Sequence, residues 1–561
     1  MRLERSLWYL LPALIGVAAV GTTVLTYSWS STLINLICSI QDDSFYYFIP
    51  GWNAAHGRGF TFGGEKTSGW QPLYELFLTG LSLCCNSMES LLRLAIHVNG
   101  WLFAATAVVA GIALRPLVRT ALPDLPRTAL MLSVSVAVLS LLSLHTVFFS
   151  SVTGKENALA GLLLALLLWR VFTPARGIAE PLVVGLLCGL LLLTRITPSS
   201  LFYSGVAILL VSTWKRKLLA MGACLVPTVT WGVFAHEYFG HVLPMSMMVK
   251  MSVHSHLTWL RDAHIGIQYL WESAKFSLSG ASRFNLLQLQ AREGLRSPLQ
   301  IGLMAAALWV SLLGLSQSLR SRSVSRAVVA LVAFDVGSAA CNALFGAVQA
   351  GKSDDIYYSV WYVFDLPVLV AVNCGFAIAW LLAQCRAARV TRHATALAAV
   401  SCLLYFAGDI AWYMRLKPYD ASDDAKFSGT WQIKKYEAAD WFLTHVRPAD
   451  PHFKVAAFSA GALAFYLHDH VINLDGLAND AAGRALIATQ SSVAYAETVK
   501  PDYLIEICRV ENGFSHLERL HVVPFRKQHD YCIDRIHYAA APTPDTRSAP
   551  SAANRPTSSS R

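Results

Sequence analysis

Six charged residues stand near the ends of long apolar runs, and they have the clearest capacity for chemistry in this sequence. They are Asp42, Asp43, Lys155, Glu156, Arg195 and Lys250. Ionisable residues near membrane depth usually face a bundle interior or a water-filled cavity. Carboxylates and cations that converge there can hold an anionic group and take a proton from a hydroxyl. We therefore ask whether these residues face the same side of a membrane.

The composition is that of a polytopic membrane protein. Of 561 residues, 55% are hydrophobic and only 14% are charged, and the mean hydropathy is +0.45. A soluble chain would carry about 25% charged residues. The net charge of +10 resides in short basic clusters between apolar runs, as the positive-inside rule expects. We therefore expect a lipid bilayer as partner and no nucleic acid.

Eleven apolar runs approach the length of about 20 residues that a membrane-spanning helix needs. They cover residues 7–27, 92–114, 128–149, 157–173, 181–194, 198–213, 217–235, 300–319, 327–348, 360–384 and 395–414. With the N-terminus in the cytoplasm, each short inner loop of this arrangement is basic. The sequence therefore predicts an α-helical polytopic membrane protein with about 11 transmembrane helices, and it places the six charged residues on the outer side.

The outer side also receives two larger segments. In the first outer loop, residues 28–91, the run 73–85 is too short to span, so we expect a helix in the interface or packed against the bundle. Residues 415–540 alternate strand and helix patterns, with strands near 453–460, 470–474 and 502–508. They predict a small extracytoplasmic α/β domain after a transmembrane domain of residues 1–414.

Two further features belong to this C-terminal part. Cys508 and Cys532 lie in the polar region and can form a disulfide if it is extracytoplasmic. From residue 541 to residue 561, Pro, Ser, Ala and Thr dominate, and no apolar period survives. This composition is typical of a disordered tail.

Four segments resemble, in chain order, the motifs of bacterial GT-C glycosyltransferases. "DDSFYYFIPGWNAAHGRGFTF" with "TSGWQPLYE" resembles their first outer loop, in which an acidic pair follows the first transmembrane helix. "VTGKENAL", "YFGHVLPMSMMVK" and "VINLDGLAND" resemble three later segments, the last in arabinofuranosyl- and mannosyltransferase-like members. Each motif alone is weak evidence. Their order from about residue 40 to about residue 480 is more specific.

The resemblance implies an integral membrane glycosyltransferase of the bacterial inner membrane. Such an enzyme moves a sugar from a polyprenyl-phosphate donor to a glycan, lipid or protein acceptor on the periplasmic face. The leaving phosphate needs its charge balanced, and the acceptor hydroxyl needs a base. We predict Asp42 as the general base of an inverting transfer, supported by Asp43, with Arg195 and Lys250 on the donor phosphate.

Other residues of these motifs are predicted to contact the substrate or a metal. The predicted substrate-binding residues are Lys155, Glu156, Tyr46, Trp70 and Gln71. A divalent cofactor, Mg²⁺ or Mn²⁺, would be held by Asp43, Glu156 and His241.

Each prediction has a structural alternative. Asp42 and Asp43 can simply mark a solvated helix exit, Arg195 can extend toward the interface from a short span, and Glu156 can cap the next helix. At the level of function, the alternatives are a polar-lipid transporter or flippase and a non-catalytic assembly protein. A transporter would predict inverted repeats and broken helices near the midplane, and we find no internal repeat in the sequence.

Overall fold

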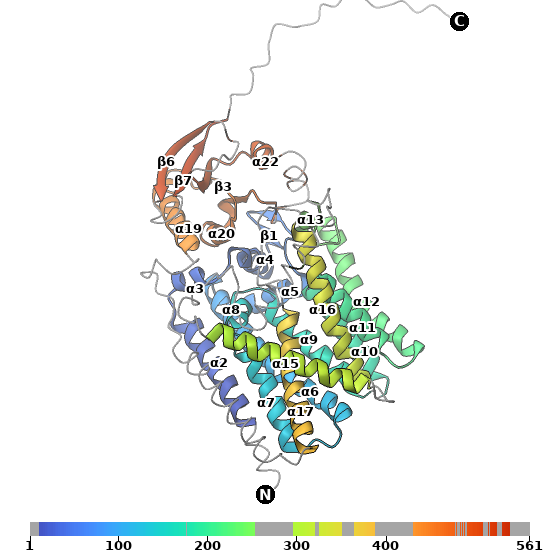
Figure 1. Ribbon diagram of the computed structural model, residues 1–561. Helices are drawn as coiled ribbons and strands as arrows, with labels where there is room; N and C mark the ends of the chain where they lie inside the picture. The colour runs from blue at the N-terminus through green and yellow to red at the C-terminus, as the bar shows by residue number, and fades with distance from the viewer. Residues whose placement is uncertain are drawn as a thin grey trace, which may run out of the picture.

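The computed structural model consists of a helical bundle with a smaller α/β domain on one end, opposite the end at which the first described helix begins (Figure 1). It describes residues 10–174, 177–252, 267, 296–319, 325–350, 364–387 and, with short gaps, 430–538. The predicted span 395–414 and the predicted tail 541–561 lie outside the described residues.

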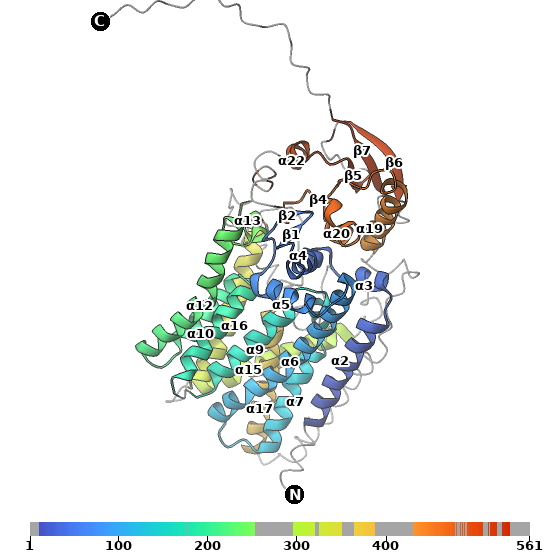
Figure 2. The same ribbon diagram turned by 180° about the vertical axis from the view of Figure 1, so that it is seen from behind.

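The other ten predicted spans each overlap a described helix of the bundle (Figure 2). They correspond to α2 (Leu11–Ser30), α6 (Met88–Ala121), α7 (Arg127–Leu142), α9 (Asn157–Phe172), α10 (Ala179–Thr194), α11 (Pro198–Leu209), α12 (Trp214–Phe239), α15 (Arg296–Leu319), α16 (Arg326–Ala350) and α17 (Asp365–Ala387). Five of them, α2, α6, α12, α16 and α17, are long and apolar enough to cross a membrane. Helices α7, α9, α10 and α11 are shorter apolar helices, and in α15 the apolar helix is Ala305–Leu319.

A buried polar network ties three of the bundle helices together. Asp365 of α17 accepts hydrogen bonds from Tyr203 of α11 at 2.5 Å and from Ser338 of α16 at 2.9 Å. Between α17 and α16, the Asn373 amide of α17 donates to the Asp335 carboxylate of α16 at 3.0 Å. Between apolar helices, interhelical hydrogen bonds and close packing supply much of the association energy, because lipid tails are as apolar as the helix surfaces.

The predicted span 128–149 is not one continuous helix. Helix α7 ends at Leu142, where the Ser143 hydroxyl bonds the Ser140 carbonyl at 2.9 Å, and the short helix α8 (His145–Val152) follows. The break redirects the chain toward the turn at Gly154, whose positive φ of 84° favours glycine. This turn carries Lys155 and Glu156.

The first outer loop folds into several short elements at the α/β end of the bundle. They are α3 (Leu33–Ser39), the 3₁₀ turn η2 (Asp42–Ser44), α4 (Phe45–Ala55), the hairpin of β1 (Thr61–Phe62) and β2 (Glu65–Lys66), and α5 (Pro72–Ser82). Helix α5 buries Tyr74 and Leu78 completely. It packs on α4, α6 and α10, so it lies against the bundle, the second of the two positions expected for the 73–85 run.

The C-terminal domain contains a five-stranded mixed sheet with the order β4-β3-β5-β7-β6. The strands are β3 (Val455–Ala457), β4 (Val471–Asn473), β5 (Tyr503–Ile507), β6 (Leu517–Val523) and β7 (Tyr531–Ile536), and the helices are α19 (Thr430–Trp441), α20 (Gly461–Leu467) and α22 (Ser492–Val499). Helical crossovers make β4, β3 and β5 parallel, whereas β7 and β6 add antiparallel strands. The predicted small α/β domain is thus confirmed.

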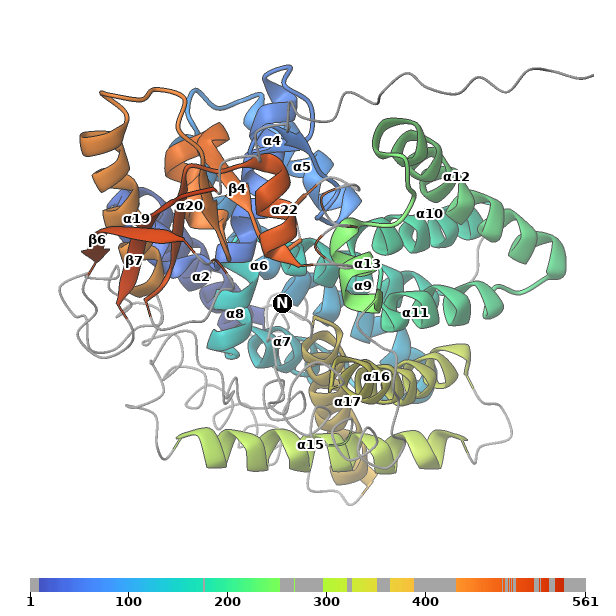
Figure 3. The same ribbon diagram turned by 90° about the horizontal axis from the view of Figure 1, so that it is seen from above.

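The C-terminal domain lies over the side of the bundle formed by α2, α6 and α8, away from α10, α11, α12 and α16 (Figure 3). It contacts the first outer loop closely. Tyr495 of α22 donates to both carboxylate oxygens of Glu65 at 2.8 and 2.9 Å. A Cβ added at Gly63 would lie 2.1 Å from the Val471 carbonyl oxygen, so the hairpin turn fits only as glycine. The first outer loop is therefore held between the bundle and the domain.

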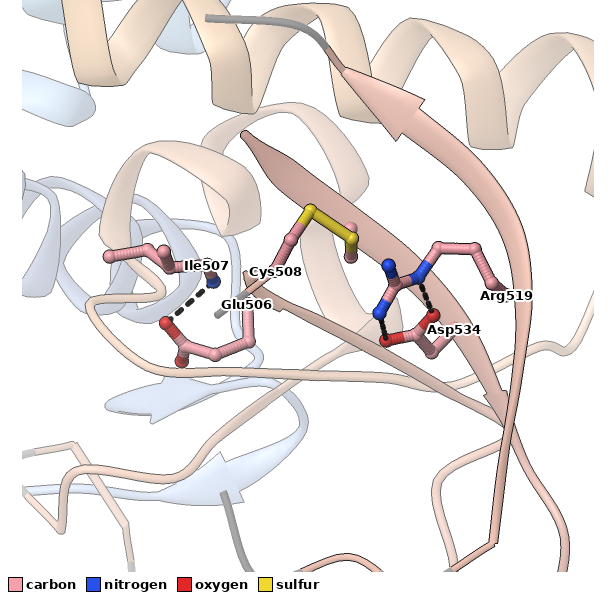
Figure 4. The surroundings of a disulfide bond; sticks show 6 residues. Glu506, Ile507, Cys508, Arg519 and Asp534 are labelled. Atoms are coloured by element: carbon pink, nitrogen blue, oxygen red, sulfur yellow. Dashed lines mark hydrogen bonds and ion pairs between the residues drawn. A yellow bond between two sulfur atoms is a disulfide. The ribbon is translucent and has the colours of Figure 1, made fainter. Parts of the chain in front are cut away.

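Cys508 and Cys532, whose pairing the sequence left open, form a disulfide that links the end of β5 to β7 (Figure 4). Beside it, Arg519 of β6 pairs with Asp534 of β7 through two contacts. Three neighbouring strands of the sheet are therefore joined by a covalent bond and an ion pair.

Replacing Cys508 and Cys532 together by serine should lower the free energy of unfolding of the C-terminal domain by about 3 kcal/mol, because the disulfide restricts the unfolded chain. Urea unfolding of the detergent-purified protein, followed by protease resistance of the domain, measures the change. Cys84→Ser, at an exposed free cysteine, is the control and should leave the midpoint unchanged. Equal midpoints for the wild type and the double variant would contradict the prediction.

Candidate active site

The η2 turn and the loop before α9 lie side by side at the end of the bundle that carries the C-terminal domain. The Ser44 hydroxyl donates to the Thr153 carbonyl at 2.6 Å. A Cβ at Gly154 would lie 2.5 Å from the ring of Phe48, so glycine allows the loop to approach α4. The two charged pairs of the sequence, Asp42-Asp43 and Lys155-Glu156, therefore meet, as we predicted.

Three ion pairs form where these segments meet. Their nitrogen–oxygen distances are 2.7 Å for Lys435–Asp42, 3.1 Å for Lys155–Asp43 and 3.1 Å for Arg195–Glu156. Three acids face three bases, which balances the charge of groups that are mostly withdrawn from water. Uncompensated charges in such surroundings would be costly.

Asp42 is engaged on both carboxylate oxygens. Oδ1 accepts from Lys435 and from the backbone N–H of Ala462 at 2.9 Å, and Oδ2 accepts from the N–H of Gly461 at 3.0 Å. A general base needs an oxygen that a substrate hydroxyl can reach. With three hydrogen bonds and a side chain that is 14% exposed, Asp42 offers an acceptor hydroxyl little access in this structure, and its role as base stays a prediction.

Asp43, the neighbouring residue, is the open carboxylate of the group. Its side chain is 46% exposed, compared with 14% for Asp42 and 6% for Glu156. Its partner Lys155 is only 4% exposed. A solvent-facing carboxylate beside a buried ammonium group combines a proton acceptor with a positive charge for an anion.

Glu156 lies deeper, in a buried set of hydrogen bonds. It pairs with Arg195 and accepts from the Tyr47 hydroxyl at 2.9 Å, and Arg195 also donates to the Asn157 side chain at 2.5 Å. Burial, and then the charge of Glu156, raises the pKa of Tyr47, so its hydroxyl stays protonated and donates. The Glu156 side chain forms no capping bond to α9. Its position therefore serves the ion pair.

Arg195 and Gln71 connect the same set to α10. The Arg195 side chain is 2% exposed and lies over the Phe364 ring at 5.5 Å. The backbone N–H of Ile196 donates to the Gln71 side chain at 3.2 Å. Arg195 is thus buried against Glu156, and its predicted contact with the donor phosphate stays a prediction.

A small pocket adjoins this buried set, between α6, α7, α8, α9 and α17. Asn157 and Phe364, both partners of Arg195, line it together with apolar side chains such as Phe103 and Val147 and with the hydroxyl side chains of Thr106, Ser150 and Ser151. Among the described residues, the Nδ2 atom of Asn157 is buried there without a hydrogen-bond partner.

Two aromatic residues predicted to contact substrate pack within the protein. Tyr46 donates to Asp475 at 2.9 Å and accepts from the N–H of Ala460 at 3.0 Å, so it joins the C-terminal domain. Trp70 is 1% exposed and packs on Trp231 at 5.6 Å. Both side chains are buried in this structure, and their contact with substrate stays a prediction.

The predicted metal ligands are engaged separately. Asp43 pairs with Lys155, Glu156 pairs with Arg195, and the His241 ring nitrogen lies 2.7 Å from the Ser68 hydroxyl. Within the described part of the chain, no three His, Cys, Asp or Glu side chains gather in a metal-binding group. Lys250 falls within α13 (Met245–Ser252), but its side chain lies outside the described residues.

Sequence reasoning missed Lys435 and Asp475, which complete the contacts of Asp42 and Tyr46. Lys435 stands in "WQIKKYEAAD", where nothing distinguishes it from the adjacent lysine. Asp475 stands in the "VINLDGLAND" segment, which resembles a family motif, and this resemblance was the signal that could have identified it.

Comparisons with known proteins agree with this architecture. Two crystal structures of ArnT from Cupriavidus metallidurans are similar to this chain at 11% sequence identity. The structure bound to undecaprenyl phosphate has a TM-score of 0.54, and the match covers 94% of this chain and 98% of that one. The structure in the apo state has a TM-score of 0.51, and the match covers 90% of this chain and 96% of that one. A family model described as a domain of unknown function, DUF8728, matches residues 426–546. No curated protein sequence matches the chain.

The fold is therefore that of a mostly helical, multi-span membrane protein like ArnT, with a mixed β-sheet domain at the C-terminal end. It agrees with the polytopic helical fold and the C-terminal α/β domain that the sequence predicted. At 11% identity, the likeness concerns the fold alone.

Removing the cation of the buried pair, in the variant Arg195→Met, should lower stability by about 3 to 5 kcal/mol, because it leaves the Glu156 carboxylate buried without its countercharge. The thermal unfolding midpoint of the detergent-purified protein measures the loss. Adding Glu156→Gln to this variant should recover most of it, because the amide carries no charge. A double variant as unstable as Arg195→Met would refute the charge-pair explanation.

Proposed function

We propose that this protein is an integral membrane glycosyltransferase that transfers a sugar from a polyprenyl-phosphate donor to a hydroxyl of a glycan, lipid or protein acceptor. The observation that carries the proposal is the open Asp43 carboxylate beside the buried Lys155 ammonium group, at the end of an ArnT-like bundle. The related ArnT structure bound to undecaprenyl phosphate supports the class of donor. The four GT-C-like segments of the sequence support the class of reaction.

The proposed reaction is a single displacement with inversion at the anomeric carbon. The acceptor oxygen forms a bond to that carbon while the bond from the carbon to the phosphate oxygen breaks. Asp43 takes the acceptor hydroxyl proton, and the polyprenyl phosphate leaves with the electron pair. Phosphate is a stable anion, so it requires countercharge but no proton donor, and Lys155 lies beside the base to supply that charge.

The other two ion pairs support these two residues from opposite sides. Glu156, next to Lys155 in the chain, is fixed by Arg195 and Tyr47. Asp42, next to Asp43, is fixed by Lys435. A base and a cation held on such supports are preoriented, which lowers the cost of reaching the reactive geometry. This proposal thus gives Asp43 the role of base that the sequence prediction gave to Asp42.

The basic loops of the sequence support a site on the outer face of a bacterial inner membrane, with the N-terminus in the cytoplasm and the C-terminal domain in the periplasm. A disulfide in the C-terminal domain is consistent with this side, because disulfides persist in oxidising compartments. A polyprenyl donor and a periplasmic acceptor would both reach this end of the bundle.

Asp43→Asn should lower the transfer rate by about 10²- to 10⁴-fold, because asparagine has the same shape but cannot take the proton. The assay follows radiolabelled sugar from a panel of polyprenyl-phosphate sugars in membranes that contain equal amounts of each variant. Asp469→Asn, which changes an exposed acid of the C-terminal domain, is the matched control. Full activity of Asp43→Asn would remove Asp43 from the role of base, and no transfer by the wild type would count against the function.

Whether the divalent metal expected at Asp43, Glu156 and His241 takes part in transfer is untested, and the same assay decides it. Because these three side chains are engaged with Lys155, Arg195 and Ser68 in turn, we expect transfer to continue after treatment with EDTA. Loss of transfer with EDTA and recovery on addition of Mg²⁺ or Mn²⁺ would instead show that a metal supplies the countercharge.

A further inference from the structure

The C-terminal domain contacts the acidic turn of the bundle through a buried lysine of α19. Lys435 Nζ lies 2.7 Å from Asp42 Oδ1 and also donates to the Ser459 carbonyl. Its side chain is 6% exposed. Glu506 of β5 is near enough that the Lys435 charge opposes the rise of its pKa that burial causes. A lysine buried at this depth is retained at a desolvation cost, which calls for a specific role.

The connection between β3 and α20 completes the contact. Two consecutive backbone N–H groups, of Gly461 and Ala462, donate to the Asp42 carboxylate. A Cβ at Gly461 would lie 2.2 Å from the Asp42 carbonyl oxygen, so the approach requires glycine. Ser459 adopts a left-handed backbone with φ of 47°, which is unfavourable for serine. This segment therefore departs from relaxed geometry where it reaches the turn.

Residues on both sides of Asp42 are held by the same domain. The Gln432 side chain of α19 donates to the Ile40 carbonyl at 3.1 Å, and Tyr46 bonds Ala460 and Asp475. The short stretch from Ile40 to Tyr46 is thus attached at three points to a domain nearly 400 residues further along the chain.

Asp43 lies between these attachments and the bundle. Asp42 points to the C-terminal domain, whereas Asp43 pairs with Lys155 and Ser44 bonds the Thr153 carbonyl. The position of the Asp43 carboxylate consequently depends on both anchors of one 3₁₀ turn. If the Lys435 contact were lost, Asp42 would keep its charge without its only ion-pair partner in the described part of the chain, and the turn would lose one anchor.

We infer that Lys435 is a positioning residue for sugar transfer, and that the domain of residues 430–538 is a working part of the site because it holds the Asp42–Ser44 turn. The inference rests on the proposed function for its catalytic consequence. It gives the domain matched by DUF8728 a role: orienting a carboxylate that belongs to another domain.

The adjacent lysine provides a matched control. Lys434 lies on the same helix but pairs with Glu437 of its own helix at 2.7 Å, and that carboxylate is 43% exposed. Replacing Lys434 by methionine removes the same charge from the same helix without touching the turn. An exposed pair of this kind contributes little to stability.

The experiment uses the full chain in nanodiscs and compares Lys435→Met, Lys435→Arg and Lys434→Met with the wild type. We expect Lys435→Met to lower kcat by at least about tenfold with a change in donor KM of less than about threefold, because a misplaced base slows chemistry more than binding. Lys435→Arg, which keeps the charge, should recover part of the rate. Lys434→Met should match the wild type. Equal losses in Lys434→Met and Lys435→Met would overturn the inference.

A double variant tests whether Lys435 acts through Asp42. If it does, Asp42→Asn together with Lys435→Met should lose no more activity than the worse single variant. Multiplied losses would place the effect of Lys435 elsewhere and overturn the assigned route.

Amide hydrogen exchange of residues 40–46 tests the anchor independently of any sugar. Exchange there should be faster in Lys435→Met, and also in Lys435→Arg if that side chain fails to fit, but not in Lys434→Met. Unchanged exchange in Lys435→Met would overturn the inference even if the wild type transfers sugar. Absence of transfer by the wild type would instead defeat the proposed function, and exchange would still decide whether Lys435 holds the turn.

Discussion

Charge compensation at one end of the bundle is the constraint on which the rest of this structure depends. Asp42 and Asp43 are adjacent acids, and Lys155 and Glu156 are an adjacent base and acid, brought together where little water reaches most of them. Each charge is matched by a partner from a different segment. The pairs therefore join α10, the loop before α9, the η2 turn and α19 into one unit, because leaving one of the buried charges unpaired would cost several kcal/mol.

This constraint explains why two adjacent aspartates differ so much. Consecutive side chains of a tight turn point in different directions, so Asp42 reaches the C-terminal domain and Asp43 reaches the bundle. Asp42 accepts hydrogen bonds from a lysine and two backbone amides, and it attaches the η2 turn to the C-terminal domain. Asp43 keeps a solvent-facing surface beside a buried cation, and it is the carboxylate proposed to take the proton. In this proposal the acidic pair combines an anchor with a reactive group.

The arrangement also links groups inside the bundle with groups at its solvent-facing end. The pocket beside Asn157 and Phe364 lies on the bundle side of the Arg195–Glu156 pair, and the Asp43 carboxylate lies on the open side of the Lys155 pair. A fold shared with ArnT over most of both chains provides the framework that holds these groups.

Much of the fold follows from local sequence. Ten predicted spans overlap described helices, because a run of about 20 apolar residues meets the condition for a membrane helix without distant partners. The strands β3, β4 and β5 were predicted in the same way, from short apolar segments bounded by turn residues. The meeting of residues 42–43 with 155–156 was also expected from the sequence, whereas the pairing of Cys508 with Cys532 was only a possibility until the structure showed it.

The tertiary structure decided which of these groups remain open. The contacts of Asp43 with Lys155 and of Asp42 with Lys435 join residues 112 and 393 positions apart, and no local pattern encodes them. The sequence alone did not show that Arg195 pairs with Glu156. Nor did it show that Trp70 packs on Trp231. Sequence determined the kinds of charge and their depth, because those depend on composition and span length. Pairing and exposure were left to the fold, because they depend on which distant segments pack together.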